Sequence, residues 1–491
     1  MGSMEHVSFD GQWWLPENPQ RRIPGTLSLD ADNGLMLLLH GDLWETIFSE
    51  SGSSDDVTTR TAAVVHGIRH DDQKYITLFE VSGTYWPMPS DYSRTVYGVG
   101  LGLVNARLTE DLFARLDVEF DYLSAWTQPP SRSDRDQSNP DVIRISTGSR
   151  ELGKTELAGG ARLSLYSGVV GSWSGSETNV REYCAFALEP VEQCAGRDLI
   201  AWVVRPLQNL LAVALGRPVR LTEVRLSTAE EATQRTVAET LFYHEQQVAA
   251  EPPLDRSDFA RNVLNYDTPT LLTAQHLVGE PLPIPVGEVL GRWFEESDKL
   301  VDALVQLLGP LNAPFMSAEH RYSSTFLSAE TLHDRLGYTT TDLPIAAHRL
   351  RTARVLDALD SAGLSESDLT WAGSIIASRN DKSLQAKLDT LLNEAGAAGA
   401  ALRQAAPSFA SEAGKLRGGV AHPSSSDDAV RRRRFVFEHA IRWLIRGLII
   451  SRLLGETELS HYWERLANKN EFKRVVKALE ATARAESGAV G

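Results

Sequence analysis

The sequence predicts an α+β protein of more than one domain, in which a β-rich N-terminal domain (a sandwich or distorted barrel) is followed by an all-α helical bundle. The first half of the 491 residues consists of short apolar or alternating runs separated by Pro, Gly, Asp and Asn, which is typical of strands and turns. From Val286 onward, apolar residues recur instead at helical spacing. The predicted boundaries are 1–3 for an expression scar, 4–245 for the β-rich domain, 246–285 for a Pro- and turn-rich connector, and 286–491 for the helical domain.

Strands in the front half are expected at a spacing of about ten residues, which favours a sandwich or barrel. They are predicted at residues 11–16, 22–29, 34–39, 62–68, 74–81, 95–103, 117–122, 142–146, 161–166, 219–227 and 236–243, with a helix at 198–215 and exposed loops at 127–140 and 148–160. Seven of the 11 Trp residues precede residue 203: Trp13, Trp14, Trp44, Trp86, Trp126, Trp173 and Trp202. Tryptophans in a β-rich domain more often form core than a binding face, and both interpretations stay open.

Residues 148–155, Gly-Ser-Arg-Glu-Leu-Gly-Lys-Thr, match the phosphate-binding P-loop pattern in full. A working P-loop must open a helix whose N-terminus faces the phosphates. Gly159, Gly160 and a strand-like run follow shortly afterwards, which leaves little room for a helix. Because no run of apolar residues ends in an Asp that would hold magnesium, we interpret the match as an ordinary strand-connecting loop.

Helices in the second half are predicted at 287–308, 317–336, 343–362, 383–395, 408–416, 428–455 and 457–483, with Ser317 as an N-cap and a Gly- and Ala-rich connection at 396–402. Four residues there are of metal-ligand type: Glu319, His320, Glu330 and His333. They supply only one carboxylate–histidine pair at i,i+3 spacing, which indicates a solvated or packed helix face. No metal site and no cofactor is predicted.

The residues best suited to chemistry are Arg417 and His422, in the segment Lys-Leu-Arg-Gly-Gly-Val-Ala-His-Pro at 415–423. On a continuous helix, five positions separate two side chains by about 140°. The two intervening glycines weaken the helix, and Pro423 biases His422 out of it, so His422 is expected at the helix C-terminus, able to turn toward Arg417. An arginine fork binds phosphate and a histidine transfers protons near neutral pH, which together suit a phosphodiester.

A second Arg-x4-His pair, Arg434 and His439, lies inside an uninterrupted helical pattern. Its two side chains are expected to diverge, because neither glycine nor proline breaks the helix between them. We interpret this second pair as structural, since a motif this short also arises by chance.

The net charge of −16 argues against a general nucleic-acid binder, which is usually basic. Basic residues nevertheless gather around the Arg417 motif, and Lys415, Arg431 and Arg432 are the candidate substrate-binding residues. A run of charge is most often a solvated helix face, but its position beside Arg417 favours contact with phosphates.

Cysteine content and the length of the apolar runs indicate the cellular compartment of the protein. Cys184 and Cys194 are the two cysteines, which supply neither a disulfide framework nor a four-ligand zinc site. The N-terminus is polar, without a signal peptide, and the apolar runs at 35–39 and 444–454 are too short or too charged to span a bilayer. The expected location is cytoplasmic, with no membrane partner.

The region around Arg417 and His422 resembles the HEPN superfamily, whose signature is Arg-x4-6-His, and specifically the HEPN domain of ApeA-type anti-phage proteins. The supporting residues are 378–384 (Ser-Arg-Asn-Asp-Lys-Ser-Leu) opening a helix, the Arg417 to His422 motif and the final apolar helix. Gly418 departs from the many members that carry Asn or another polar residue there. The front half resembles the N-terminal domain of ApeA-type proteins at 13–16 (Trp-Trp-Leu-Pro) and 23–27 (Ile-Pro-Gly-Thr-Leu).

The resemblance implies a metal-independent endoribonuclease of abortive anti-phage defence, with His422 as general base or acid and Arg417 on the phosphate. It also implies a homodimer through the C-terminal helices and an N-terminal sensor that responds to a phage-derived trigger. The broad apolar face of residues 435–449 is expected to serve the core and a partner. The alternative is a non-catalytic binding protein with a lectin-like β-domain and a helical dimerisation module, which the Trp-rich front half and Gly418 favour.

Overall fold

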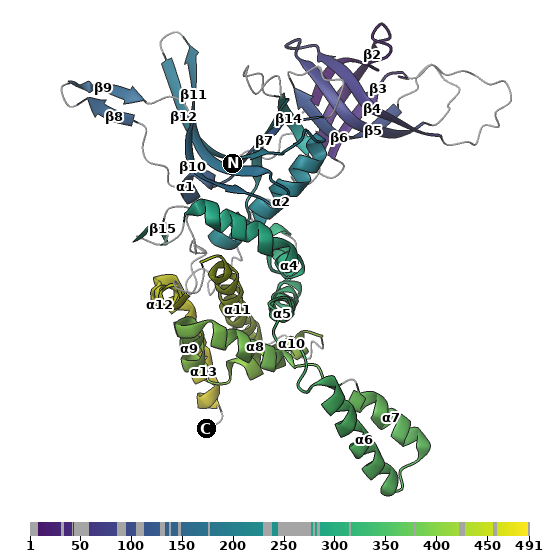
Figure 1. Cartoon of the computed structure of the whole chain (residues 1–491), viewed down its shortest axis with the longest axis vertical. Coiled ribbons are helices and arrows are strands. Elements are labelled where there is room, and N and C mark those ends of the chain that lie inside the picture. The colour runs from purple at the N-terminus through teal and green to yellow at the C-terminus, as the bar shows by residue number, and fades with distance from the viewer. Residues whose placement is uncertain are drawn as a thin grey trace, which may run out of the picture.

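The computed structural model describes residues 8–30, 34–41, 43, 58–85, 95–104, 112–127, 133–136, 139–145, 149–174, 177–228, 238–243, 276–277, 280–281, 285–313, 316–377, 379–421, 428–454 and 459–489. A β-rich part reaches residue 243 and a helical part begins at Val286, so the predicted order of the two architectures is confirmed. Figure 1 shows the sheet in purple and blue, with the green and yellow helices on one side of it.

A long antiparallel sheet dominates the β-rich part. Its strands are β1 (Ser8–Trp14), β2 (Ile23–Asp30), β3 (Gly34–Leu39), β4 (Thr58–Arg69), β5 (Tyr75–Tyr85), β6 (Thr95–Val104), β7 (Arg115–Phe120), β10 (Arg150–Glu156), β11 (Arg162–Ser174), β12 (Glu177–Glu189), β13 (Leu221–Ser227) and β14 (Ala238–Tyr243). Within the described ranges they form one sheet of 12 strands in the order β10-β11-β12-β7-β13-β14-β6-β3-β2-β1-β4-β5. Two separate pairs are β8 (Ser133–Asp136) with β9 (Asn139–Ile145), and β15 (His276–Leu277) with β16 (Glu280–Pro281).

Strands β1 to β6 close into a barrel, because β5 pairs with β6 as well as with β4. The barrel has its own apolar core, which includes Trp13, Leu37 and Leu78. Trp13 lies over Gly67, where an added Cβ would come within 2.3 Å of the indole ring, and its Nε1 donates to the Gly25 carbonyl oxygen at 3.1 Å. A side chain at Gly67 would therefore displace Trp13 and open the barrel core.

Beyond the barrel the sheet continues as a curled arm, which contains β13, β7, β12, β11 and β10. Alternate residues of β7 face an ion-pair network on one side of the arm. Arg115 donates to Asp117 at 2.8 Å, and Arg181 and Arg225 each donate to Glu119 at 2.6 Å. The opposite charges offset part of the cost of removing these groups from water, but burial still raises the pKa of Glu119 above its usual value.

The helical part contains α4 (Val286–Asn312), α5 (Ala318–Arg335), α6 (Ile345–Ser361), α7 (Glu366–Ala377), α8 (Leu384–Glu394), α9 (Gly396–Ala405), α10 (Phe409–Ala421), α11 (Asp428–Leu454), α12 (Leu459–Asn468) and α13 (Asn470–Ala489). Ser317 caps α5 as predicted, since its side chain accepts the backbone N–H of His320. Ser383 caps α8 in the same way. Figure 1 shows α6 and α7 as a hairpin that projects away from the other helices.

Helix predictions differ from the structure at α7, at α9 and at the last helix, and α10 also extends beyond its predicted end at residue 416. Helix α7 has no counterpart among the predicted helices. Residues 396–402, expected as a connection, belong to α9, and the single helix expected at 457–483 is divided into α12 and α13. The sequence of α9 is rich in Gly and Ala and has little apolar periodicity, so its helix depends on packing against α8, α12 and α13.

One apolar core joins the arm of the sheet to the helical part. It includes Phe186 of β12, Leu210 of α2 (Gly196–Leu215) and Ile441 of α11. Trp293 of α4 is buried in the same core, and its Nε1 donates to the Pro206 carbonyl oxygen of α2 at 2.8 Å. Packing therefore sets the position of the helices relative to the sheet, whereas the predicted connector 246–285 lies almost wholly outside the described residues.

The apolar face predicted on residues 435–449 belongs to this shared core. Phe435, Leu444 and Ile449 of α11 are all buried within the chain itself. Helix α11 is packed against the protein's own α2, α4, α5 and α13, so these buried residues are not open to a partner. The homodimer stays a prediction, and its contact must use another surface.

The segment that matches the P-loop pattern forms strand β10 instead of the expected exposed loop. An added Cβ on Gly153 would come within 2.2 Å of Val286 in α4, and one on Gly287 within 2.0 Å of the Lys154 carbonyl oxygen. These glycines allow the start of α4 to lie directly on β10. Since β10 pairs with β11 and opens no helix, the arrangement is not that of a P-loop.

The tryptophans of the front half are mostly core where their side chains are described. Trp13, Trp14 and Trp126 are buried, whereas Trp202 on α2 is exposed. The expected loop at 127–140 contains β8. Among the helices that the structure describes, α2 is long and apolar enough to cross a membrane, but it is largely buried against the sheet and α4, as core helices are.

Candidate active site

Helix α10 carries Arg417 and is held by three other helices. It packs on α5 and α8. At its start, Phe409 stacks on Phe437 of α11, with ring centroids 4.9 Å apart. One turn later, Glu412 accepts a hydrogen bond from Arg433 of α11 at 2.5 Å. These contacts determine the direction in which α10 presents its remaining side chains.

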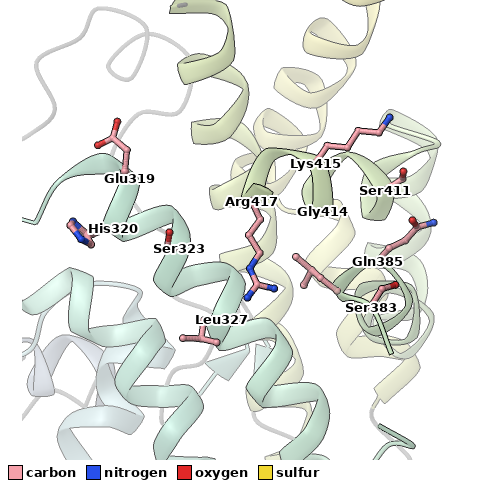
Figure 2. Close-up of a pocket in the computed structure, with 11 residues that line it drawn as sticks. Glu319, His320, Ser323, Leu327, Ser383, Gln385, Ser411, Gly414, Lys415 and Arg417 are labelled. Atoms are coloured by element: carbon pink, nitrogen blue, oxygen red, sulfur yellow. The ribbon is translucent and has the colours of Figure 1, made fainter. Parts of the chain in front are cut away.

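Arg417 reaches from α10 to Glu330 of α5. Its Nη1 donates to Glu330 Oε1 at 2.5 Å, and the Arg417 side chain is 41 % exposed. A guanidinium carries five N–H donors in a rigid fork, so one carboxylate contact leaves donors for a second anion. Figure 2 shows Arg417 extending from α10 toward α5, near Leu327. Glu330 thus anchors the arginine while part of the guanidinium stays accessible.

A cavity of about 1000 Å³ lies between α5, α8 and α10. It is lined by Glu319, His320, Ser323, Leu327, Ser383, Leu384, Gln385, Ser411, Gly414, Lys415 and Arg417. In Figure 2 the α5 residues lie on one side and Ser383, Gln385 and Ser411 on the other, with Arg417 between them. The lining therefore combines two cations, Arg417 and Lys415, and one carboxylate, Glu319, with imidazole, hydroxyl, amide and apolar groups.

His422 lies outside the described residues, as do residues 423–427. Helix α10 is described as far as Ala421, directly before His422 in the sequence, and the position of His422 at a helix end stays a prediction. The helix extends beyond its predicted end at residue 416 and includes Gly418 and Gly419. Packing of α10 on α5 and α8 outweighs the cost of about 1 kcal/mol that each helical glycine carries relative to alanine.

The three predicted substrate-binding residues occupy different places. Lys415 lines the cavity, but Figure 2 shows it pointing away from Arg417, since residues two apart on a helix do not share a face. Arg431 is close enough to interact electrostatically with Glu319, which lines the cavity. The pKa of Glu319 is lowered mainly by a backbone hydrogen bond, and the positive charge of Arg431 lowers it further. Arg432 is exposed on α11 and is not part of the cavity lining.

The second Arg-x4-His pair is packed within the helical part. His439 is part-buried, its Nδ1 donates to the Phe435 carbonyl oxygen at 3.1 Å, and its ring centroid lies 4.3 Å from that of Phe435. Burial lowers the pKa of His439, which keeps the imidazole neutral at pH 7. Arg434 is buried on the same helix. This environment suits a structural histidine.

The four residues of metal-ligand type do not converge. Glu330 binds Arg417, and the buried His333 contacts Asp334 through its Nδ1 at 2.9 Å. In the portion of the chain that the structure describes, no group of three or more His, Cys, Asp or Glu residues is arranged to hold a metal ion.

Sequence reasoning did not find the partners of Arg417. Glu330 precedes it by 87 positions, and the sequence around Glu330 indicates only a residue of metal-ligand type. Ser383 and Gln385, which lie across the cavity, carry no motif that joins them to α10. The single hint is that Ser383 falls in the 378–384 stretch on which the HEPN resemblance rests.

Residues 8–264 match the family model described as ApeA N-terminal domain 1. The chain belongs to this family. The ApeA N-terminal domain 1 match spans the barrel, the curled arm and α2, and it ends before α4. No curated protein and no solved structure matches the chain. Membership of the ApeA N-terminal domain 1 family links the chain to anti-phage defence, and Arg417 lies in the helical part beyond the matched residues.

Proposed function

We propose that the chain is a HEPN-type endoribonuclease that cleaves RNA without a metal ion as part of anti-phage defence. The observation that carries the proposal is the Arg417 guanidinium, held by Glu330 at the wall of a cavity, on the helix that ends directly before His422. The ApeA N-terminal domain 1 family supports the role in defence. The Arg417 to His422 signature supplies the chemistry.

In the proposed reaction, the 2′-OH oxygen of one RNA nucleotide attacks the adjacent phosphorus, and the bond from phosphorus to the 5′ oxygen breaks. A base takes the 2′-OH proton and an acid protonates the departing 5′ oxygen, which leaves a 2′,3′-cyclic phosphate and a 5′-OH. His422 serves as one of these two groups. Arg417 binds the non-bridging oxygens and stabilises the negative charge that the phosphate gains in the transition state.

A reaction that needs both a base and an acid supports a composite site. In a homodimer through the C-terminal helices, the partner's His422 supplies the second proton-transfer group. When wild-type and His422→Ala chains are mixed, cleavage should then fall by more than the wild-type fraction, because a mixed dimer holds a single His422 and lacks the second proton-transfer group. A fully active monomer in solution at micromolar concentration would contradict the dimer.

Control by the N-terminal part is supported by the shared core. The arm of the sheet packs against α4, and α2 packs against α4 and α11, so a rearrangement of the arm reaches the helices that hold α10. We propose that a phage-derived trigger acts on this N-terminal part. Lys415, Arg431 and Arg432 are proposed to contact phosphates that flank the cut.

The test is cleavage of RNA by the purified full-length chain, with and without phage lysate, in buffer that contains EDTA. Expected products carry 2′,3′-cyclic phosphate or the phosphates formed by opening it. Cleavage that stops in EDTA, or an Arg417→Ala chain that cuts like the wild type, would show that the proposed chemistry is wrong.

A further inference from the structure

The cavity beside Arg417 is larger than a phosphate requires. Its volume of about 1000 Å³ lies at the upper end of the range of about 300–1,000 Å³ that accommodates small organic ligands. Arg417 supplies an anion-binding group at one point of the wall, and most of the lining has no charge. The space next to Arg417 therefore suits a group that is attached to a phosphate.

The uncharged lining fits a nucleobase. Leu327 and Leu384 offer apolar surface, and the imidazole of His320 offers a flat face of the kind on which unpaired bases stack. Hydroxyl and amide groups stand on both sides, from Ser323 on α5 and Gln385 on α8. Hydroxyls and amides can donate and accept, so together they can read the edge of a base.

The walls of the cavity are fixed to one another. Glu330 of α5 joins Arg417 of α10, and Lys387 of α8 donates to Asp334 of α5 at 2.6 Å. His320 is oriented by Ser317, whose Oγ lies 3.0 Å from the imidazole Nδ1. A preformed pocket loses little entropy on binding, which favours selection among bases by shape and hydrogen bonds.

We infer that this cavity binds one unpaired nucleotide of single-stranded RNA, with its phosphate at Arg417 and its base between α5 and α8. Base-paired nucleotides are excluded, because a duplex presents its backbone and grooves and cannot insert a single base between three helices. The inference rests on the proposed ribonuclease function and adds that the cut site is selected by the nucleotide in this cavity.

Gly414 provides a means of filling the cavity without disturbing its walls. It lines the cavity from α10, and a Cβ added there would meet no atom within 4 Å. Gly414→Trp therefore places an indole in the cavity, and tryptophan has a higher helix propensity than glycine, so α10 should not be weakened. Gly309 in α4 is a matched control, since it is also a helical glycine with no atom within 4 Å of an added Cβ, and it is not part of the lining. Ser323→Trp fills the cavity from the opposite wall.

The experiment measures binding of 2′-O-methylated single-stranded homo-oligonucleotides of each base, which lack the attacking hydroxyl, to the full-length chain. Gly414→Trp and Ser323→Trp should each weaken binding by roughly tenfold or more, as expected when one base loses its site, whereas Gly309→Trp should bind like the wild type. Sequencing of cut ends should show a base preference in the wild type that Gln385→Ala changes. Thermal melting confirms that each variant is folded.

Unchanged RNA binding by both cavity-filling variants would overturn the inference. It would also be overturned if the substitutions blocked binding of a nucleoside monophosphate but left the affinity for RNA unchanged. The two proposals fail separately. If Arg417→Ala abolishes cleavage but Gly414→Trp alters neither RNA binding nor cut sites, the proposed ribonuclease function is supported and the nucleotide-binding cavity is rejected. If RNA binds in the cavity and no condition produces cleavage, the proposed function is wrong and the pocket stands.

Discussion

The Arg446 guanidinium of α11 caps the C-terminal end of α2, and its Nε donates to the Val213 carbonyl oxygen at 2.8 Å. Its Nη2 also donates to the Ala214 carbonyl oxygen at 3.2 Å. The last carbonyls of a helix have no partner within the helix and carry its partial negative charge, so they favour a cation. Burial lowers the pKa of Arg446 to about 9, and the group is therefore still protonated at neutral pH.

Removing this cap should weaken the joint between the β-rich and helical parts. Arg446→Ala leaves two buried carbonyls without a donor and opens a void, so the free energy of unfolding should fall by about 3 kcal/mol. Arg452→Ala, at an exposed position of the same helix, is the matched control and should change stability by less than about 0.5 kcal/mol. Urea denaturation measures both. Equal stability of the two variants would mean that the cap contributes nothing.

Gly216, which follows α2, should be coupled energetically to Arg446. It has φ of +71°, and an added Cβ would come within 2.4 Å of Arg446 Nη1. Gly216→Ala therefore meets both backbone strain and a steric clash with the guanidinium. In an Arg446→Ala background the clash disappears, so the cost of Gly216→Ala should drop by about 1 kcal/mol or more. Additive effects in this double-mutant cycle would contradict the close contact.

The two Arg/His pairs should respond differently to substitution. Arg417→Ala and His422→Ala should each lower the rate of RNA cleavage by about 10²–10⁴-fold while the chain stays folded, as expected for loss of a group that acts in the transition state. Arg434→Ala and His439→Ala form the matched control pair, since His439 is packed against Phe435 and bonded to its carbonyl. Initial rates on a labelled RNA decide the point. Wild-type rates for His422→Ala would remove it from the mechanism.

Glu330 should act as a positioning residue for Arg417. Glu330→Gln keeps the shape of the side chain but loses the charge-assisted hydrogen bond, so the guanidinium should sample other orientations. We expect kcat to fall by about tenfold, an effect of about 1.4 kcal/mol on the barrier, with little change in KM or melting temperature. Faster cleavage would instead show that Glu330 competes with the RNA phosphate for Arg417.

His439 should make the chain less stable in mild acid. Burial depresses its pKa below the value of 6.5 found in water, so between these two pKa values the unfolded chain binds a proton that the folded chain does not. Stability is therefore retained above pH 6.5 and falls as the pH drops below it, by up to about 1.4 kcal/mol per pH unit for this group. Replacing His439 with Gln should flatten this slope, which denaturation at pH 5 and pH 7 measures.

Elements whose signal is local could be read from the sequence. Strand β3 follows from a short apolar run, and helices such as α4, α8 and α11 follow from helical periodicity. Ser317 caps α5 because its hydroxyl reaches a backbone N–H three residues away. Each of these features depends on interactions between residues close in the chain.

Tertiary structure decided the rest, because it depends on contacts between residues that are far apart in the chain. The loop predicted at β10 is a strand since β11 pairs with it and α4 lies on Gly153, and α9 is a helix since neighbouring helices cover it. The apolar face of α11 was visible in the sequence, but only the tertiary structure shows that α11 packs against α2, α4, α5 and α13. The sequence likewise predicts Arg417 as a phosphate-binding residue, whereas Glu330, which lies 87 positions away, is brought to Arg417 by the packing of α5 against α10.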